Sequence, residues 1–245
     1  MSGGIVVRVC EELEEFRACV ELQKEIWNEA DLEIVPDTIF VVAAHTGGQT
    51  IGAFDGDRLI GFTLSMPGLR NGAAYLHSHM TGVRAEYRDR GAGRLLKLYQ
   101  RDEALSRDVR LIEWTFDPLE MRNGHFNLNR LGAIARRYEP NLYGITSSPL
   151  HRGLATDRLV AEWYLDSPRV LLALNGELPN PQCAESIEIP ASLEHWKSND
   201  LPQVQALQSR IRGQFMEGFA KGYAAVGVTR TGEGSAYQLA PWSDF

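Results

Sequence analysis

The feature that most constrains the fold is a glycine-bearing stretch in the middle of the chain, Ala74–Ser106. It starts as a strand-like run, Tyr75–Val83, and continues as a helix with apolar residues on roughly one side: Leu95, Leu98, Tyr99 and Leu105. A polar loop that contains Gly91 and Gly93 separates the two elements. Converging backbone N–H groups and the helix dipole make such a turn an anion-binding site, whose natural ligand is a phosphate or pyrophosphate. The alternative is that the glycines only shape a tight strand-to-helix turn.

The spacing within the loop narrows this choice. Arg88 is followed by two residues, then Gly91, then one residue and Gly93, which matches neither a P-loop nor a GxGxxG pattern. It resembles the Arg/Gln-x-x-Gly-x-Gly/Ala motif of the GNAT superfamily of acyl-CoA-dependent N-acyltransferases. The resemblance implies that the loop binds the CoA pyrophosphate and that the preceding strand separates from its neighbour to admit the pantetheine arm. The cofactor-binding residues that it implies are Thr81, Gly82, Val83, Arg88, Asp89, Arg90, Gly91, Ala92, Gly93, Arg94 and Asn123.

Composition limits the classes of protein that this chain can belong to. Of its 245 residues 44% are apolar and 23% charged, as in ordinary globular proteins, and the net charge of -7 disfavours nonspecific binding to nucleic acid. The first residues do not have the pattern of a signal peptide, and no apolar run is long enough for a membrane helix. Cys10, Cys19 and Cys183 lack metal-ligand spacing. We therefore expect a cytoplasmic protein without a membrane, nucleic-acid or metal partner.

Periodicity and turn signals predict the element order β-α-α-β-β-β-α-β-α-β-β up to about residue 166. The clearest local signal is a hairpin at Asp55-Gly56-Asp57, whereas Pro67–Gly72 indicates a second turn and Asn123–Arg130 a short helix. This order predicts an α+β fold with a mixed sheet and helices on both faces. It is also the order of the GNAT fold, so the resemblance covers roughly residues 5–166.

The sequence changes character after residue 166, which predicts a domain at 1–166 and an extension at 167–245. The extension reads as β-α-β-β, with a strand at Ser186–Ile189, a helix that follows Asp200 and a hairpin around Thr231–Gly234. It has few apolar residues of its own. We expect it to dock on the main domain or on a second subunit, which would make a homodimer.

N-acyl transfer requires a polarised thioester, a base for the amine and an acid for the leaving thiolate. The resemblance assigns the first task to the backbone of Thr81–Val83. His77 and His79 lie two residues apart on the same strand, so alternation places them on one face with Thr81 and Val83. They resemble the His-x-His pair of arylalkylamine N-acetyltransferases, which helps to remove the proton of the amine. The alternative is that these histidines are structural.

Other residues compete for these roles. Glu113 is a rival base if its apolar neighbours raise its pKa, and it could equally lie on the rim of the site. The resemblance suggests Tyr143 as the acid, with Tyr138 as its rival, while Asn123 contacts pantetheine or caps a helix. Asp157-Arg158 either orients an amino-acid acceptor or forms a structural ion pair.

The whole chain also resembles a narrower group of predicted GNAT acyltransferases, through stretches that include Asp117-Pro118-Leu119 and Thr156–Trp163. Some of that group resemble acyltransferases associated with N-acylamino acid racemases. We expect an enzyme that transfers an acetyl- or succinyl-type group from acetyl-CoA or another acyl-CoA to a small-molecule amine, an amino acid among the candidates. The alternative is a non-catalytic CoA-binding sensor or scaffold with the same fold.

Overall fold

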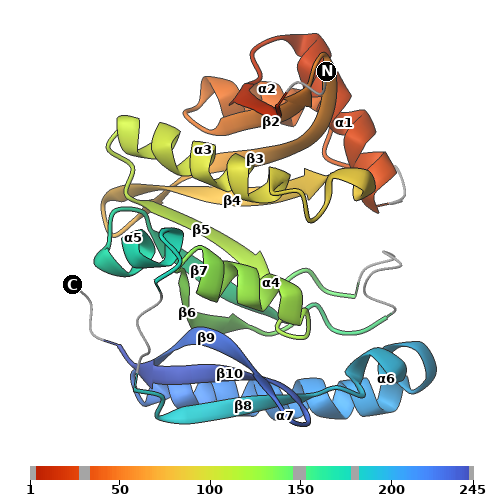
Figure 1. Cartoon of the computed structure of the whole chain (residues 1–245), viewed down its shortest axis with the longest axis vertical. Coiled ribbons are helices and arrows are strands. Elements are labelled where there is room, and N and C mark those ends of the chain that lie inside the picture. The colour runs from red at the N-terminus through yellow and green to blue at the C-terminus, as the bar shows by residue number, and fades with distance from the viewer. Residues whose placement is uncertain (1–3, 28–33, 146–152, 178–181, 243–245) are drawn as a thin grey trace. The chain divides into compact units, whose positions relative to one another are not determined.

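The computed structural model describes residues 4–27, 34–145, 153–177 and 182–242. Its contacts divide the chain into two compact units, Met1–Glu113 and Trp114–Phe245 (Figure 1). The expected division into 1–166 and 167–245 is a different one and stays a prediction about which parts can fold alone.

The first unit is a sheet in which β1 to β5 are neighbours in chain order. The strands are β1 (Val6–Val9), β2 (Gln49–Asp55), β3 (Arg58–Arg70), β4 (Ala73–Val83) and the start of β5 (Leu111–Phe116). Pairing is antiparallel as far as β4, and β4 then pairs with β5 in parallel at only two positions, Leu76–Ile112 and His77–Glu113.

Helices cover both faces of this sheet, as an α+β fold requires. On one face α1 (Leu13–Trp27) and α2 (Asp37–His45) bury Phe16 and Phe40 against Phe62 of β3. On the other face α3 (Ala92–Ser106) packs Ala92 and Leu96 against β2. Because each face of the sheet is apolar, both layers are needed to bury it.

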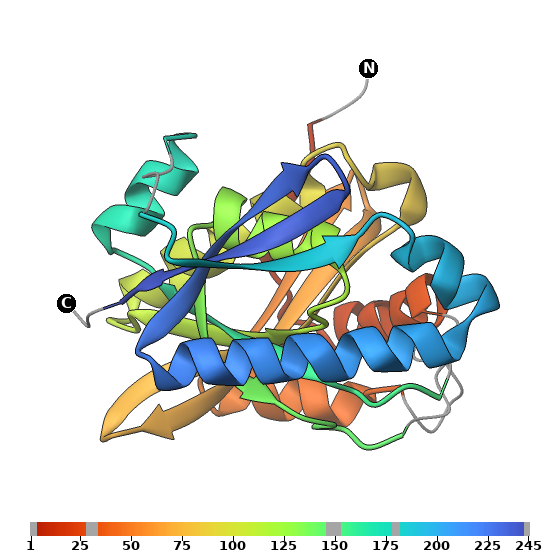
Figure 2. The ribbon, with the colours of Figure 1, turned by 90° about the horizontal axis from the view of Figure 1, so that it is seen from below.

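The second unit is a sheet in the order β7-β6-β9-β10-β8. Its strands are β6 (Ile134–Glu139), β7 (Arg158–Tyr164), β8 (Glu185–Pro190), β9 (Tyr223–Thr231) and β10 (Gly234–Pro241). Its helices are α4 (Met121–His125), extended by a π-helical turn at Phe126–Arg130, α5 (Pro168–Leu174), α6 (Leu193–Asn199) and α7 (Leu201–Ala220). The long helix α7 packs along β6, β8 and β9 (Figure 2).

Two prolines lie within or at the start of regular elements, and one of them differs from the prediction of a turn at Pro67–Gly72. Pro67 lies within β3, opposite Leu76, and the turn falls instead at Asn71 and Gly72, which both have positive φ. Pro168 begins α5, where Ser167 accepts a hydrogen bond from the Val170 N–H. Proline is suited to the first helical position because the N–H it lacks would have no partner there.

Candidate active site

The loop with the motif glycines leads directly into the N-terminus of α3. Gly91 has φ of 83° and is the residue before the helix, and Asp89 has φ of 62°. The N-cap of α3 is Gly91, which has no side chain, and the first turn of the helix carries no acidic residue. The partial positive charge at this helix end favours a negatively charged ligand.

The side chains predicted around this loop have different environments. Arg88 and Arg90 are exposed, Arg94 and Gly93 are half-buried, and Ala92 is buried against β2. Both exposed arginines contact the residues that precede the loop: Arg88 Nε donates to the Val83 carbonyl at 3.2 Å, and the Arg90 guanidinium lies 5.6 Å from the centre of the Tyr87 ring.

At the end of β4, the three residues predicted to face the cofactor lie directly before this loop. Thr81 Oγ1 lies 2.9 Å from Thr63 Oγ1, and Val83 packs on the α3 side. Gly82 meets α1 on the opposite face, where a Cβ would lie 2.8 Å from Ile26 and 3.0 Å from Trp27. A residue larger than glycine would require the ends of the Ile26 and Trp27 side chains to shift.

A β-bulge at His79 changes which faces the β4 side chains occupy. Ser78 pairs with Ser65 and Met80 pairs with Leu64, so His79 is an extra residue without a counterpart on β3. The prediction that His77 and His79 share a face with Thr81 and Val83 is therefore wrong. His77 pairs with Met66 and Thr81 with Thr63, and because these partners are three residues apart they face opposite sides of the sheet.

The two histidine rings nevertheless lie near each other, with centroids 6.3 Å apart. Part of the His79 side chain is exposed to solvent, yet the surrounding protein lowers the pKa of His79 because it dehydrates the imidazolium form. A neutral imidazole at neutral pH can accept a proton.

The rival base, Glu113, is buried and forms an ion pair with Arg70. The alternative that Glu113 lies on the rim is therefore wrong. Its backbone pairs with that of His77 across the short parallel ladder, so Glu113 and His77 are neighbours in the sheet. The Arg70 guanidinium binds this carboxylate directly, so Glu113 is not surrounded by apolar groups alone.

A buried polar cluster between α3, β3 and β4 was not predicted. Lys97 donates to Ser78 Oγ at 2.8 Å and to Gln100 Oε1 at 2.9 Å, and Gln100 donates to Ser65 Oγ at 2.6 Å. Burial lowers the pKa of Lys97 to about 7. The apolar pattern of α3 misled the sequence interpretation, since Leu95 is exposed whereas Lys97 and Gln100 are on the buried face.

In the second unit, the Tyr143 side chain is held at the end of β5. Its hydroxyl lies 3.0 Å from Thr115 Oγ1, its N–H donates to Thr156 Oγ1 at 2.9 Å, and the Arg158 guanidinium lies 5.5 Å from its ring. Half of the side chain remains exposed, so the phenol can be reached by a ligand.

The rival acid, Tyr138, is buried and donates to Asp157 at 2.7 Å. Burial and this carboxylate raise the pKa of Tyr138 well above its usual range, which makes it a poor proton donor. Asp157 itself is fully buried and forms its ion pair with Arg212, not with Arg158. The alternative that Asp157 orients an amino-acid acceptor is therefore wrong.

Asn123 is the third residue of α4, and the residue before that helix is Glu120. The alternative that Asn123 caps the helix is therefore wrong. Its side chain is exposed, and its contact with pantetheine stays a prediction.

Within the described ranges, no group of three His, Cys, Asp or Glu side chains is placed to hold a metal ion. In the same residues, no helix is long and apolar enough to cross a membrane.

Comparison with solved structures identifies the class of fold that this geometry defines. No protein-family model matches the sequence, and no curated protein matches it at a significant level. The chain is similar to a GNAT-family acetyltransferase from Streptococcus pneumoniae, with a TM-score of 0.52 and 14% identity over 65% of this chain and 98% of that one. It therefore has the GNAT fold, an α+β fold with a mixed sheet.

Two further solved structures are similar to this chain over about the same share of its length. Arabidopsis thaliana NAA60 in complex with a bisubstrate analogue gives a TM-score of 0.53 and 15% identity over 66% of this chain and 99% of that chain. The NatC complex bound to Gag peptide and CoA gives 0.51 and 16% identity, over 65% and 98%. Each neighbour is matched almost completely, so about a third of this chain lies outside the shared fold.

Proposed function

We propose that this chain is an acyl-CoA-dependent N-acyltransferase. It would move an acetyl- or succinyl-type group to the amine of a small molecule, with amino acids the class favoured by the narrower resemblance. The observation that carries the proposal is the N-terminus of α3, which begins directly after a positive-φ glycine and follows a bulged strand β4. The bound CoA in one structural neighbour, the NatC complex, supports the choice of cofactor.

In this proposal the first N–H groups of α3 bind the CoA pyrophosphate, and Arg88 and Arg90 add positive charge. The bulge leaves backbone groups near His79 outside the ladder, so an N–H there can polarise the thioester carbonyl. His79 takes the proton of the amine, whose nitrogen then attacks the thioester carbon. A C–N bond forms and the C–S bond breaks. The departing thiolate takes a proton from an acid, for which the family resemblance suggests Tyr143, and that acid regains its proton from solvent.

The competing function is a CoA-binding sensor without turnover, because a fold does not fix an activity. Both functions require CoA binding, and only the enzyme releases free thiol when acetyl-CoA or succinyl-CoA is mixed with amino acids and other small amines. Thiol release that depends on one class of amine supports the enzyme. Tight CoA binding with no release above the uncatalysed rate, over a broad panel, supports the sensor.

The cofactor site can be tested at Gly91, where replacement by Val forces a β-branched residue into a positive-φ backbone conformation. We expect the acyl-CoA dissociation constant of Gly91→Val to rise at least tenfold in calorimetry, because the N–H groups no longer converge. Gly56→Val is the matched control, since Gly56 also has positive φ and open space around it but lies in the β2–β3 turn. Equal affinity in both variants would remove the loop assignment.

A further inference from the structure

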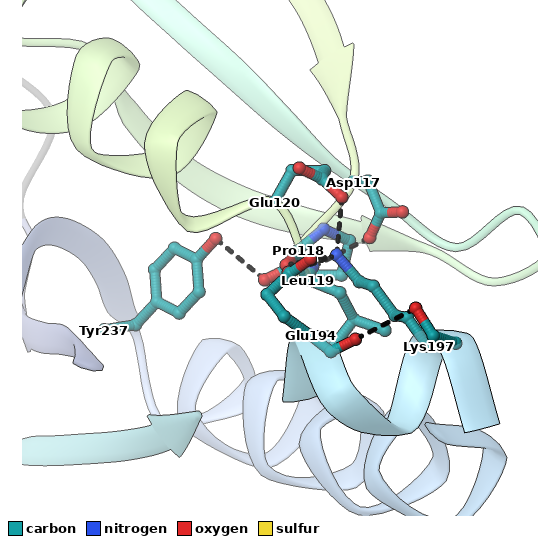
Figure 3. A network of polar contacts seen from close by, with 8 residues as sticks. Asp117, Pro118, Leu119, Glu120, Glu194, Lys197 and Tyr237 are labelled. Atoms are coloured by element: carbon teal, nitrogen blue, oxygen red, sulfur yellow. Dashed lines mark hydrogen bonds and ion pairs between the residues drawn. The ribbon is translucent and has the colours of Figure 1, made fainter. Parts of the chain in front are cut away.

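The part of the chain after β7 contacts the turn that leads from β5 into α4. Lys197 of α6 forms ion pairs with Glu120 at 2.6 Å and with Glu194 at 3.0 Å (Figure 3). Tyr237 of β10 is buried and its hydroxyl donates to the Pro118 carbonyl at 2.9 Å (Figure 3). Two separate elements of the C-terminal segment thus hold the short turn from which α4 and Asn123 start.

A second connection reaches the segment that carries Tyr143. The Asp157 carboxylate is fully buried, and Arg212 of α7 binds it with two hydrogen bonds, each of 2.9 Å. The same carboxylate accepts from the Tyr138 hydroxyl at 2.7 Å and from the Asn141 N–H at 3.0 Å. Both oxygens of Asp157 are therefore engaged, and the paired hydrogen bonds from Arg212 fix their orientation.

From Asp157 the contacts continue to Tyr143 through the preceding residue, Thr156. The Thr156 N–H donates to the Asn141 side chain at 3.1 Å, and its carbonyl accepts from the Leu142 N–H at 3.0 Å. Its hydroxyl accepts from the Tyr143 N–H at 2.9 Å and donates to the Gly144 carbonyl at 2.8 Å. Asn141 has φ of 48°, so this turn has a backbone conformation that depends on its partners.

We propose that Arg212 is a positioning residue of the enzyme, which acts through Asp157 and Thr156 to fix the backbone that carries Tyr143, the proposed acid. The C-terminal segment would then order the part of the second unit that carries Tyr143. This inference rests on the proposed function, because the role of Tyr143 as the acid is itself proposed.

The first test is Arg212→Met, with Arg210→Met as the control. Arg210 lies two residues earlier on α7, where it donates to the Glu188 carbonyl, away from the Tyr143 segment. For Arg212→Met we expect kcat, measured as thiol release from acetyl-CoA with the amino acid that reacts fastest, to fall about 10- to 100-fold. The Kd for CoA should stay within about twofold of the wild-type value, since Arg212 does not touch the proposed phosphate site. Arg210→Met should keep wild-type kcat.

Hydrogen exchange provides a readout that does not depend on activity. The amides of Leu142, Tyr143 and Gly144 should exchange at least about tenfold faster in Arg212→Met than in wild type or Arg210→Met. A double-mutant cycle adds the link to catalysis, because Arg212→Met should cost little further kcat in a Tyr143→Phe background. Unchanged exchange at these amides overturns the proposal, as does faster exchange with wild-type kcat.

Arg212→Met leaves a buried carboxylate without its cation and could fail to fold. Arg212→Lys keeps the charge and loses the paired hydrogen bonds, so the same measurements on it decide the proposal, with smaller changes in the same direction. The proposed function is tested separately, because it fails if the wild-type protein releases no thiol from acyl-CoA. The exchange rates then still decide whether Arg212 orders the Tyr143 segment, and unchanged rates overturn that as well.

Discussion

At the residue scale, His79 carries the most direct prediction about the chemistry. Its pKa lies below the usual value near 6.5, so the imidazole is neutral and able to accept a proton at neutral pH. Wild-type kcat/KM should therefore fall only as the pH drops through a pKa below about 6.5, where His79 becomes protonated. His79→Ala should lower kcat by roughly two to four orders of magnitude, and its residual rate should climb with pH toward the pKa of the amine.

The neighbouring groups supply the controls for this experiment. His77→Ala tests whether both rings take part through a shared water, and Glu113→Gln tests the carboxylate that pairs with Arg70. If both histidine variants keep the wild-type kcat and pH profile while Glu113→Gln abolishes turnover, the base is Glu113. If all three variants turn over normally, the amine loses its proton to bulk water and the protein contributes orientation.

At the element scale, the strand, loop and helix around Gly91 could be predicted because their signals are local. These signals are a strand-like run, glycines that permit a tight turn, and apolar residues at helical spacing. The bulge at His79 could not, since an alternating pattern in one strand does not show where the partner strand skips a residue. The same limit applies to Lys97, which reads as a solvated helix residue until the hydroxyl and amide groups of Ser78 and Gln100 are brought to it.

The polar cluster under β4 predicts how stability depends on pH. The pKa of Lys97 is about 7 in the folded chain and near 10.4 when unfolded. Between these values the unfolded chain binds more protons, so the free energy of unfolding should rise with pH from about 7 to 10. Below about 7 both states are protonated, and the cost of the buried ammonium is fully present.

Lys97→Met should remove this rise, which urea unfolding at pH 6.5, 8 and 9.5 can measure. Lys24→Met on α1 is the control, because Lys24 is exposed and should leave the wild-type pH dependence in place. A Lys97→Met chain with the wild-type slope would show that Lys97 stays protonated in the folded protein above pH 7.

At the scale of the whole molecule, the sequence interpretation could not show which strands of the expected extension pair with strands of the expected domain. Ala135 of β6 pairs with Ala225 of β9, across the expected boundary at 166/167. Periodicity is a property of neighbouring residues, so it cannot reveal which distant strands pair. The apolar face of α7 was expected to cover the main domain or a second subunit. It is buried in this chain, with the Phe215 ring 5.7 Å from Tyr138 and 5.2 Å from Tyr237.

This arrangement predicts that the C-terminal segment is required for the second unit to fold. A chain that ends at residue 177 loses β9, which pairs with β6, and Arg212, the cation that binds buried Asp157. What remains of the second unit should therefore show no cooperative thermal transition and should aggregate.

A point variant tests the same idea without truncation. Phe215→Ala should lower the free energy of unfolding by about 3–5 kcal/mol. Met216→Ala, half exposed on the same helix, should change it by about 0.5 kcal/mol or less. A monodisperse truncated chain with the wild-type thermal midpoint would show that the second unit folds without the C-terminal segment.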